Sequence, residues 1–320
     1  MEVIHLSPSD DLQTVINSLK SGTTVYLKAG IYRQKAEITA DNIKIIGEDR
    51  EKTVITFDDY ARKPHADGRE YNTFRTYTLC ISGNNVSLEN LTVQNSNTDP
   101  VTRGQCVALS VHGKFFRAKD VTLKSTQDTL FLSPFPDDLV IRYSGLTDDE
   151  TYYDGFIPKN QLYTEGGNLH VFEDCEICGT VDYVFGCAEA YFSHCKFVTL
   201  YDGRNYAFVA APAHPLAQES GFSFIDCDFV SGGAKKQTVY LARPWRDFGK
   251  CDFINCRIDE SIKSELFDKW NDTYRDKTAR FAYYNLEGDM SPVSWAKELT
   301  PLQAEEIIKH FNAKLKANIR

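Results

Sequence analysis

The stretch Phe172-Glu173-Asp174-Cys175-Glu176-Ile177 decides the fold, because variants of it recur along the chain. In most copies an acidic residue or Asn precedes Cys or another apolar residue, and one polar and one apolar residue follow. The copies occupy residues 88–93, 118–123, 192–197, 224–229 and 253–258, with a poorer one at 42–47. We read each copy as a short strand in a repeating structure.

The spacing of the copies indicates an all-β solenoid. It varies from 20 residues between Cys175 and Cys195 to 32 residues between Cys195 and Cys227. Short strands joined by loops of variable length are typical of a parallel β-helix, whose coils bury their apolar faces by stacking. A sandwich or a barrel also has many short strands. A ladder formed by Cys175, Cys195, Cys227 and Cys256 favours the β-helix.

Both ends of the chain predict short helices that cap the solenoid. Asp10 or Asp11 precedes an apolar stripe at i, i+3, i+4 and i+7, and Gly22 follows it. Thr300-Pro301-Leu302-Gln303 is a capping box with Pro at the first helical position, and it opens a helix to about Ala317. We therefore expect one domain, residues 1–320, with both open ends of the solenoid shielded.

Composition and net charge limit the classes of partner that the protein can bind. The chain has 320 residues, 42% of them hydrophobic, and a net charge of −9. A surface with this charge disfavours nucleic acid as a partner, and no apolar run is long enough for a membrane helix. We expect a monomer. The first residues lack the pattern of a secretory signal, so we expect a cytoplasmic protein; the alternative is a secreted one whose signal was removed.

The nine cysteines have a structural interpretation. Their odd number favours reduced thiols in a reducing compartment. Cys175 and Cys178 form a CxxC pair, but no second pair has the spacing of a four-ligand zinc site. We therefore predict core packing, with no metal and no organic cofactor.

Four segments depart from the repeat and carry the candidate chemistry. They are Gly104-Gln105-Cys106-Val107-Ala108-Leu109, Gln127-Asp128-Thr129-Leu130-Phe131, Val181-Asp182-Tyr183-Val184-Phe185-Gly186 and Leu241-Ala242-Arg243-Pro244-Trp245. Unpaired buried charges are costly, so we expect Asp128, Asp182 and Arg243 to meet across neighbouring coils. Two carboxylates, one held ionised by Arg and the other exchanging protons, form a plausible hydrolase site.

These four segments, in this order, resemble the signatures of the pectin methylesterase (pectinesterase) family of carbohydrate esterases. The resemblance extends over almost the whole chain, and it implies a right-handed parallel β-helix. It also implies hydrolysis of the methyl esters of galacturonosyl units in pectin or oligogalacturonides, with release of methanol. Gln34-Lys35 stands where the family often has Glu, and Phe131 where it often has Tyr.

The resemblance implies a role for each matching residue. Asp182 would attack the C6 carbonyl, and Asp128 would protonate the departing methanol and then activate water. Gln105 and Gln127 would stabilise the oxyanion, and Arg243 would orient Asp182. The resemblance also implies five substrate contacts: Trp245, Phe131, Val181, Phe185 and Thr78.

The long interval between the two acidic motifs predicts an insertion. Asp128 and Asp182 are 54 residues apart in sequence, more than the ~20–25 residues of one coil. The excess lies near residues 133–167 and contains several aromatic residues. We expect a rim excursion that shapes the substrate cleft, although a hairpin that only covers scaffold is the alternative.

Other functions remain open from the sequence. A pectate lyase would need a calcium cluster, which does not coincide with the four motifs, whereas a polygalacturonase could use the two Asp residues. A non-catalytic carbohydrate-binding solenoid would not need them. The same machinery could also act on another carbohydrate ester or a thioester. The acidity of the chain predicts weaker binding as methyl groups are removed, and hence little processive action.

Overall fold

The computed structural model describes residues 2–65, 68, 70–144 and 167–318. Its helices are α1 (Leu12–Asn17), α2 (Pro100–Arg103), α3 (Asp137–Ser144) and α6 (Pro301–Asn318). The strands before the two acidic motifs are β1 (Val3–Leu6), β2 (Thr24–Leu27), β3 (Gly30–Arg33), β4 (Ala36–Ile38), β5 (Lys44–Gly47), β6 (Thr53–Phe57), β7 (Leu79–Ile81), β8 (Val86–Asn95), β9 (Leu109–Val111) and β10 (Phe115–Lys124).

The strands that follow complete the solenoid. They are β11 (Leu130–Leu132), β12 (Leu169–Glu173), β13 (Glu176–Gly179), β14 (Val181–Gly186), β15 (Glu189–Ser193), β16 (Lys196–Leu200), β17 (Ala207–Pro212), β18 (Phe222–Ile225), β19 (Asp228–Gly232), β20 (Val239–Ala242), β21 (Lys250–Ile254), β22 (Arg257–Ile258), β23 (Arg280–Tyr284) and β24 (Lys297–Glu298).

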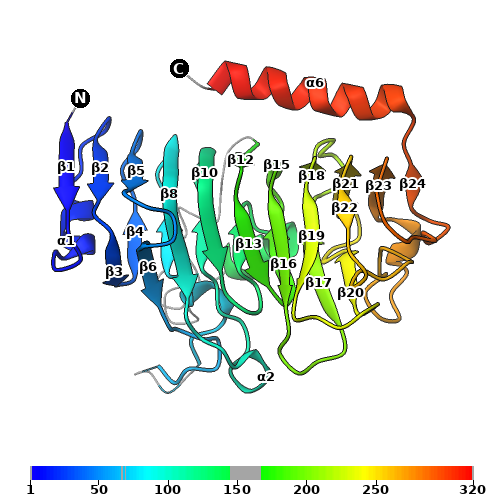
Figure 1. Ribbon diagram of the computed structural model, residues 1–320, viewed down its shortest axis with the longest axis horizontal. Coiled ribbons are helices and arrows are strands. Elements are labelled where there is room, and N and C mark those ends of the chain that lie inside the picture. The colour runs from blue at the N-terminus through cyan, green and yellow to red at the C-terminus, as the bar shows by residue number, and fades with distance from the viewer. Residues whose placement is uncertain (1, 66–67, 69, 145–166, 319–320) are drawn as a thin grey trace.

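The strands stack in parallel into a right-handed β-helix, as the repeat and the resemblance predicted. A typical coil has three strands, such as β12, β13 and β14, and each pairs with its counterpart in the next coil. Two of the resulting strips merge through the long strands β8 and β10 into one 17-stranded sheet. The third strip is a separate sheet in the order β20-β17-β14-β11-β9-β7-β4. Figure 1 shows the coils side by side along the long axis.

A left-handed residue bends the chain between the first two strands of each later coil. Asp174, Asp226 and Asn255 have φ values of 55°, 53° and 53°, and they are followed directly by a ladder cysteine. Asp and Asn tolerate this conformation better than other non-glycine residues. The repeat is therefore a strand–turn–strand unit in these coils. The interpretation of each copy as a single strand holds only for β8 and β10, which run through the bend.

The core repeats the same side chains from coil to coil. Phe172, Phe192, Phe224 and Phe253 form a stack with centroid separations of 4.8, 4.9 and 4.6 Å. The ladder cysteines lie beside this stack, and each thiol contacts a backbone carbonyl of the preceding coil. The Sγ···O distances are 3.4 Å from Cys195 to Phe172, 3.3 Å from Cys227 to Phe192 and 3.4 Å from Cys256 to Phe224. Core packing of these cysteines agrees with the prediction.

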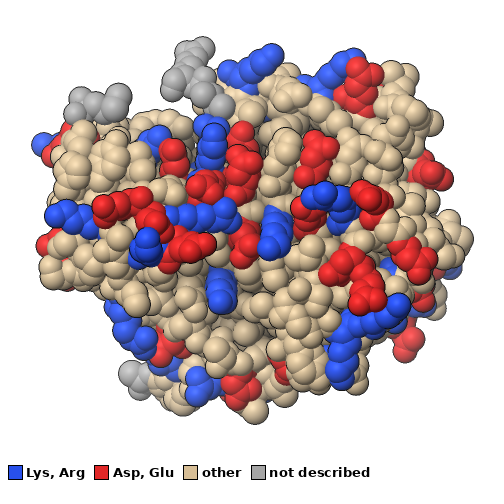
Figure 2. Space-filling model, viewed as in Figure 1, with Lys and Arg blue, Asp and Glu red and all other residues tan. Residues whose placement is uncertain are grey.

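The outer face of the large sheet carries paired charges. Figure 2 shows basic and acidic side chains interleaved over the face seen in Figure 1. Pairs between neighbouring coils include Arg117–Glu173, with 2.6 Å between Nε and Oε2, and Arg257–Asp228, with 2.6 Å between Nε and Oδ1. Such pairs between exposed groups add little stability each, but they keep the outer surface polar.

The two terminal helices behave differently. α1 begins after Asp11, whose carboxylate accepts a hydrogen bond from the Thr14 amide, and it lies at the N-terminal end of the stack, as expected. α6 has the predicted capping box, with Gln303 N–H donating to Thr300 Oγ1 and Thr300 N–H to Gln303 Oε1. Among the described residues, no helix combines the length and apolar character needed to cross a membrane.

The prediction that the C-terminal helix shields the open end of the solenoid is wrong. Figure 1 shows α6 lying along the side of the stack, across the strands from β12 to β24. Phe311 stacks on Tyr191 at 4.8 Å, and it shares a buried cluster with Leu169, Val171 and Ile225. These residues of the sheet face outward and are apolar, so the apolar stripe of the helix is covered there rather than at the end.

Candidate active site

Three polar residues lie at or just before the start of successive strands of the seven-stranded sheet. Gln105 precedes β9, Asp128 precedes β11, and Asp182 is the second residue of β14. These strands are neighbours in the order β9-β11-β14, and the Asp128 N–H donates to the Val181 carbonyl at 3.0 Å. Residues 54 positions apart in sequence therefore lie on adjacent coils. The third strip of the solenoid thus brings the two acidic motifs together.

Both acidic residues have a left-handed backbone, with φ values of 62° for Asp128 and 51° for Asp182. The pairing of β14 with β17 also shifts register between Val181 and Val184, where Asp182 lies. A bulge of this kind redirects a side chain away from the regular alternation of a strand. The flanking Val181 and Tyr183 point into the interior, while Asp182 faces the cleft.

Arg243 binds Asp182 through both ends of its guanidinium group. The Nε–Oδ1 distance is 2.8 Å and the Nη2–Oδ2 distance is 2.6 Å. The guanidinium carbon lies 3.8 Å from the Phe208 ring centroid and 3.9 Å from that of Trp270. Two aromatic faces and a planar bidentate contact leave this arginine little freedom. The arrangement orients the Asp182 carboxylate.

Asp128 lies in a different environment. Its side chain is buried, and this burial together with the negative charge of Asp182 raises its pKa well above the usual value. The positive charge of Arg243 opposes that rise. One carboxylate is thus paired with arginine, whereas burial favours the neutral form of its neighbour, and two such different environments suit nucleophilic and acid–base roles.

Two amides accompany the carboxylates. Gln105 and Gln127 both line the cleft. The Gln127 Oε1 accepts a hydrogen bond from Arg204 Nη1 at 3.1 Å, so the NH₂ group of Gln127 is directed away from Arg204. Donors of this kind can stabilise negative charge on a carbonyl oxygen.

The cleft has a volume of about 450 Å³. Its lining contains all five predicted catalytic residues and two of the predicted substrate contacts, Trp245 and Phe185. The remaining lining residues are Asn72, Thr73, Phe74, Leu139, Ala211, Arg246 and Trp270. The four motifs therefore converge on one site.

The other three substrate contacts require correction. Thr78 and Phe131 are 0% exposed and Val181 is 2% exposed, so a sugar cannot reach them. The Thr78 hydroxyl donates to the Gln94 carbonyl at 3.0 Å. Phe131 is covered by Phe74 and lies 5.0 Å from it, centroid to centroid. Phe131 instead packs beneath the lining residues Phe74 and Phe185.

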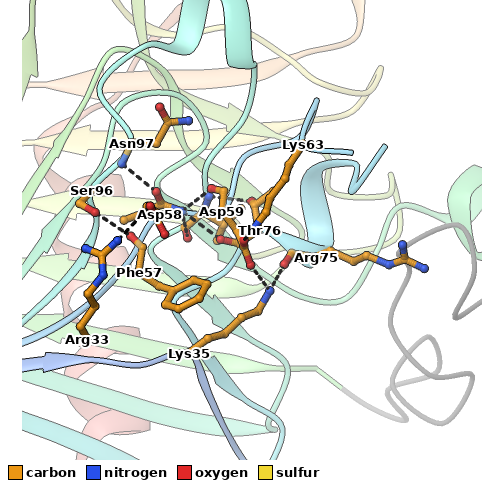
Figure 3. A network of polar contacts seen from close by, with 12 residues as sticks. Arg33, Lys35, Phe57, Asp58, Asp59, Lys63, Arg75, Thr76, Ser96 and Asn97 are labelled. Carbon is orange, nitrogen blue, oxygen red and sulfur yellow. Dashed lines mark hydrogen bonds and ion pairs between the residues drawn. The ribbon is translucent and has the colours of Figure 1, made fainter. Parts of the chain in front are cut away.

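A charge network holds the segment that carries Phe74. Figure 3 shows the Asp59 carboxylate between two lysines, with Lys35 Nζ at 2.8 Å and Lys63 Nζ at 2.5 Å. Lys35 also donates to the Arg75 carbonyl. The Asn95 amide donates to the carbonyls of Asp59 and Thr76, each at 2.9 Å. These contacts fix the residues on either side of Asn72, Thr73 and Phe74, which line one wall of the cleft.

The beginning of the predicted insertion also borders the site. Phe135 packs on Phe74 at 4.7 Å, and Leu139 of α3 lines the cleft. Asp138 forms an ion pair with Arg246, with Nε and Oδ1 2.6 Å apart. These contacts are consistent with a cleft-shaping role for residues 133–144. The remainder of the excursion, 145–166, lies outside the described residues.

The contributors that sequence reasoning missed include Phe74, Trp270, Arg204 and the Lys35–Asp59–Lys63 network. All come from loops outside the repeat and the four motifs. Trp270, a lone tryptophan in a polar stretch, was the most visible signal. Among the described residues, no group of three or more His, Cys, Asp or Glu side chains is arranged to hold a metal ion.

Comparison with known proteins gives a consistent result. A family model described as "Pectinesterase" matches residues 7–134 and 151–314. Pectinesterase 31 of Arabidopsis thaliana is 26% identical over 314 residues, covering 93% of this chain and 86% of the relative. Probable pectinesterase/pectinesterase inhibitor 12 of the same plant is 27% identical and covers 82% of this chain. The chain spans 42% of that relative and 33% of a second one, putative pectinesterase/pectinesterase inhibitor 43.

Solved structures agree with the fold. Pectin methylesterase PemA from Erwinia chrysanthemi superposes with a TM-score of 0.76 at 25% identity, covering 95% of this chain and 94% of that one. A pectin methylesterase in complex with a hexasaccharide has the same TM-score at 24% identity. The enzyme from carrot, at 19% identity and a TM-score of 0.74, matches in fold.

Proposed function

This chain belongs to the pectinesterase family, and from that premise we propose that it removes methyl groups from methyl-esterified galacturonosyl units and releases methanol. The observation that carries the proposal is the bidentate Asp182–Arg243 pair beside the buried Asp128, which lines the same cleft and whose pKa is raised by burial. Ester hydrolysis through a covalent intermediate needs an ionised nucleophile and an acid that becomes a base.

In the first half of the proposed reaction, an Asp182 oxygen attacks the C6 carbonyl carbon. The carbonyl π electrons move to its oxygen, which Gln105 and Gln127 stabilise by hydrogen bonds. When the carbonyl re-forms, the C–O bond to the methoxy group breaks and Asp128 gives its proton to the leaving oxygen. Methanol departs, and the galacturonosyl acyl group remains on Asp182 as an anhydride.

In the second half, Asp128 is ionised and takes a proton from water. The resulting hydroxide adds to the acyl carbon, and cleavage of the anhydride returns Asp182 as a carboxylate. Asp128 again carries a proton, and the carboxylic acid product ionises on release. Arg243 stays bound to Asp182 and keeps it oriented in the resting state.

The charges around the cleft support methylated, neutral sugars as the preferred ligands. Arg243 is paired with Asp182, Arg246 with Asp138, and the nearby Arg204 with Asp202. Since these cations already have carboxylate partners, a product carboxylate finds weak attraction there, and the net charge of −9 opposes it further. We therefore propose release after each demethylation, with little movement along a block.

A reducing compartment, such as the cytoplasm, remains our proposed location. Its support is that all nine cysteines are free thiols. Short methylated oligogalacturonides would then be the substrates that reach the enzyme. Fractionation of the native source, with a cytoplasmic marker as control, tests the location.

Methanol release tests the activity. The enzyme is supplied with highly methylated pectin and with fully methylated trigalacturonate, and Asp182→Ala serves as the inactive control. Release from either substrate that disappears in the variant supports the proposal, and faster release from the short substrate supports the oligomer role. Absence of methanol from both substrates contradicts it and favours another ester or a binding role.

A further inference from the structure

Arg204 lies behind the catalytic amide rather than in the cleft. It belongs to the loop between β16 and β17, and it is not among the described residues that line the cleft. Its Nη1 donates to Gln127 Oε1 at 3.1 Å, and its Nη2 donates to Thr180 Oγ1 at 3.2 Å. Asp202 accepts from Arg204 Nε at 2.9 Å and from Nη2 at 2.5 Å. One guanidinium therefore joins an acidic residue, a hydroxyl and the amide.

These contacts determine which way the Gln127 amide faces. A guanidinium has only donors, so the atom that it contacts must be the amide oxygen. The NH₂ group of Gln127 consequently points away from Arg204, and Gln127 lines the cleft together with Asp128 and Asp182. Without Arg204, either end of the amide could face the reacting centre, and the oxygen would repel the oxyanion.

Asp202 makes this orientation rigid. Its side chain is 6% exposed and that of Arg204 is 17% exposed, so the ion pair lies mostly beneath the surface. Burial of Asp202 opposes ionisation, but the hydrogen bonds from Arg204 hold its pKa below the usual value. A planar guanidinium that is ion-paired with Asp202 can hold the Gln127 amide in one orientation better than a flexible ammonium group would.

We propose that Arg204, held by Asp202, is a positioning residue that presents the NH₂ group of Gln127 to the ester oxyanion. The inference rests on the esterase function proposed above. It assigns Arg204 an effect on the chemical step through Gln127, without contact with the substrate. Neither Arg204 nor Asp202 belongs to the four motifs, so the proposal adds a contribution from the loop between β16 and β17 to the site.

A double-mutant cycle tests the proposal. Methanol release from methylated trigalacturonate is measured for the wild type, Arg204→Met, Gln127→Ala and the double variant. We expect each single variant to lose about 10²-fold in kcat, with KM changed by less than about threefold. The double variant should be no slower than the slower single variant, because both changes remove one function. Additive losses, or a raised KM at unchanged kcat, overturn the proposal.

Three further variants separate positioning from charge and from folding. Arg204→Lys keeps the charge but cannot support Asp202, Thr180 and Gln127 together, so it should remain at least about tenfold slow; full activity overturns the proposal. Asp202→Asn keeps the side-chain size and should lower kcat in the same direction. Arg117→Met removes an ion-paired arginine on the outer sheet and should retain the wild-type kcat. Thermal unfolding of every variant verifies that the native fold is present.

The two proposals fail in different ways. If the wild type releases no methanol, the esterase function fails, and the positioning role fails with it. If the wild type is active and Arg204→Met has an unchanged kcat, only the positioning role fails.

Discussion

At the scale of single residues, the site contains unfavourable backbone conformations and buried charges, and neighbouring groups stabilise the buried charges. Asp128 and Asp182 both occupy left-handed backbone conformations, which are rare outside glycine and often mark functional positions. Arg243 offsets the buried charge of Asp182 through a bidentate contact and two aromatic faces. The strain and the desolvation are concentrated where the reaction is proposed to occur.

The raised pKa of Asp128 predicts a pH dependence of stability. The charged groups around this carboxyl are Asp182, Arg243 and Arg204. The pKa of Asp128 is higher in the folded protein than in the unfolded chain, where it is ~3.9. The stabilisation that Asp128 contributes to the free energy of unfolding is therefore complete below this unfolded pKa. It is lost as the pH rises through the folded-state pKa. We expect Asp128→Asn to unfold at a higher temperature than the wild type in neutral and alkaline buffers.

The measurement is the Tm of both proteins across pH, with methanol release in parallel. In the wild type, kcat/KM should fall on the alkaline side as Asp128 loses its proton, and the variant should be inactive throughout. A Tm difference that does not change with pH would argue that Asp128 is already ionised in the folded protein.

The sequence predicted the charged residues of the site better than the apolar ones. Asp128, Asp182 and Arg243 were expected to meet because a buried charge needs a partner, and that argument requires no knowledge of loops. The burial of Phe131, in contrast, depends on the ring of Phe74, which lies in a segment outside the repeat. That segment has no periodicity, so its path over Phe131 could not be inferred from the pattern.

At the scale of elements, each coil depends on its neighbours. The Phe stack inside β12, β15, β18 and β21 places one ring per coil at separations below 5 Å. A polar residue precedes each ladder cysteine, namely Asp174, His194, Asp226 or Asn255, and the sequence shows this polar position. Its effect, which is to divide the copy into two strands, follows from a backbone angle that the sequence pattern does not report.

Removing one ring of the stack should destabilise the solenoid. Phe224 is fully buried and stacks on both Phe192 and Phe253. We expect Phe224→Ala to lower the free energy of unfolding by about 3–5 kcal/mol, and Phe224→Leu to lower it by less because a smaller cavity remains. Urea denaturation followed by circular dichroism measures both. Equal losses in the two variants would contradict the cavity argument.

The Lys35–Asp59–Lys63 network should matter for the wall of the cleft. Replacing Lys35 by Met removes its contacts with Asp59 and with the Arg75 carbonyl, so the segment that carries Phe74 loses one of its attachments. We expect a higher KM for methylated trigalacturonate and a smaller change in kcat, because the catalytic residues belong to other strands. Lys44→Met, which removes a surface pair with Glu89, is the matched control. Unchanged KM in Lys35→Met would show that the remaining contacts suffice.

At the scale of the whole molecule, the interior contains all of the thiols. Every cysteine is buried, and burial raises the pKa of Cys80, Cys187 and Cys251 above the usual range. Reaction with a thiol reagent needs both access and a thiolate. We expect the native protein to react slowly with Ellman's reagent, and the protein unfolded in guanidinium chloride to react at all nine cysteines. Rapid modification under native conditions would show that the coils open locally.

The position of α6 has a consequence for how the protein is made. Phe311 contacts Tyr191 across 120 positions of sequence, while most strand contacts join successive coils. During synthesis, coils from the N-terminal end can stack as they leave the ribosome, but the apolar outer faces of β12 and β15 stay uncovered until α6 has emerged. A nascent chain stalled before residue 301 would therefore expose an apolar sheet surface of the kind that chaperones recognise.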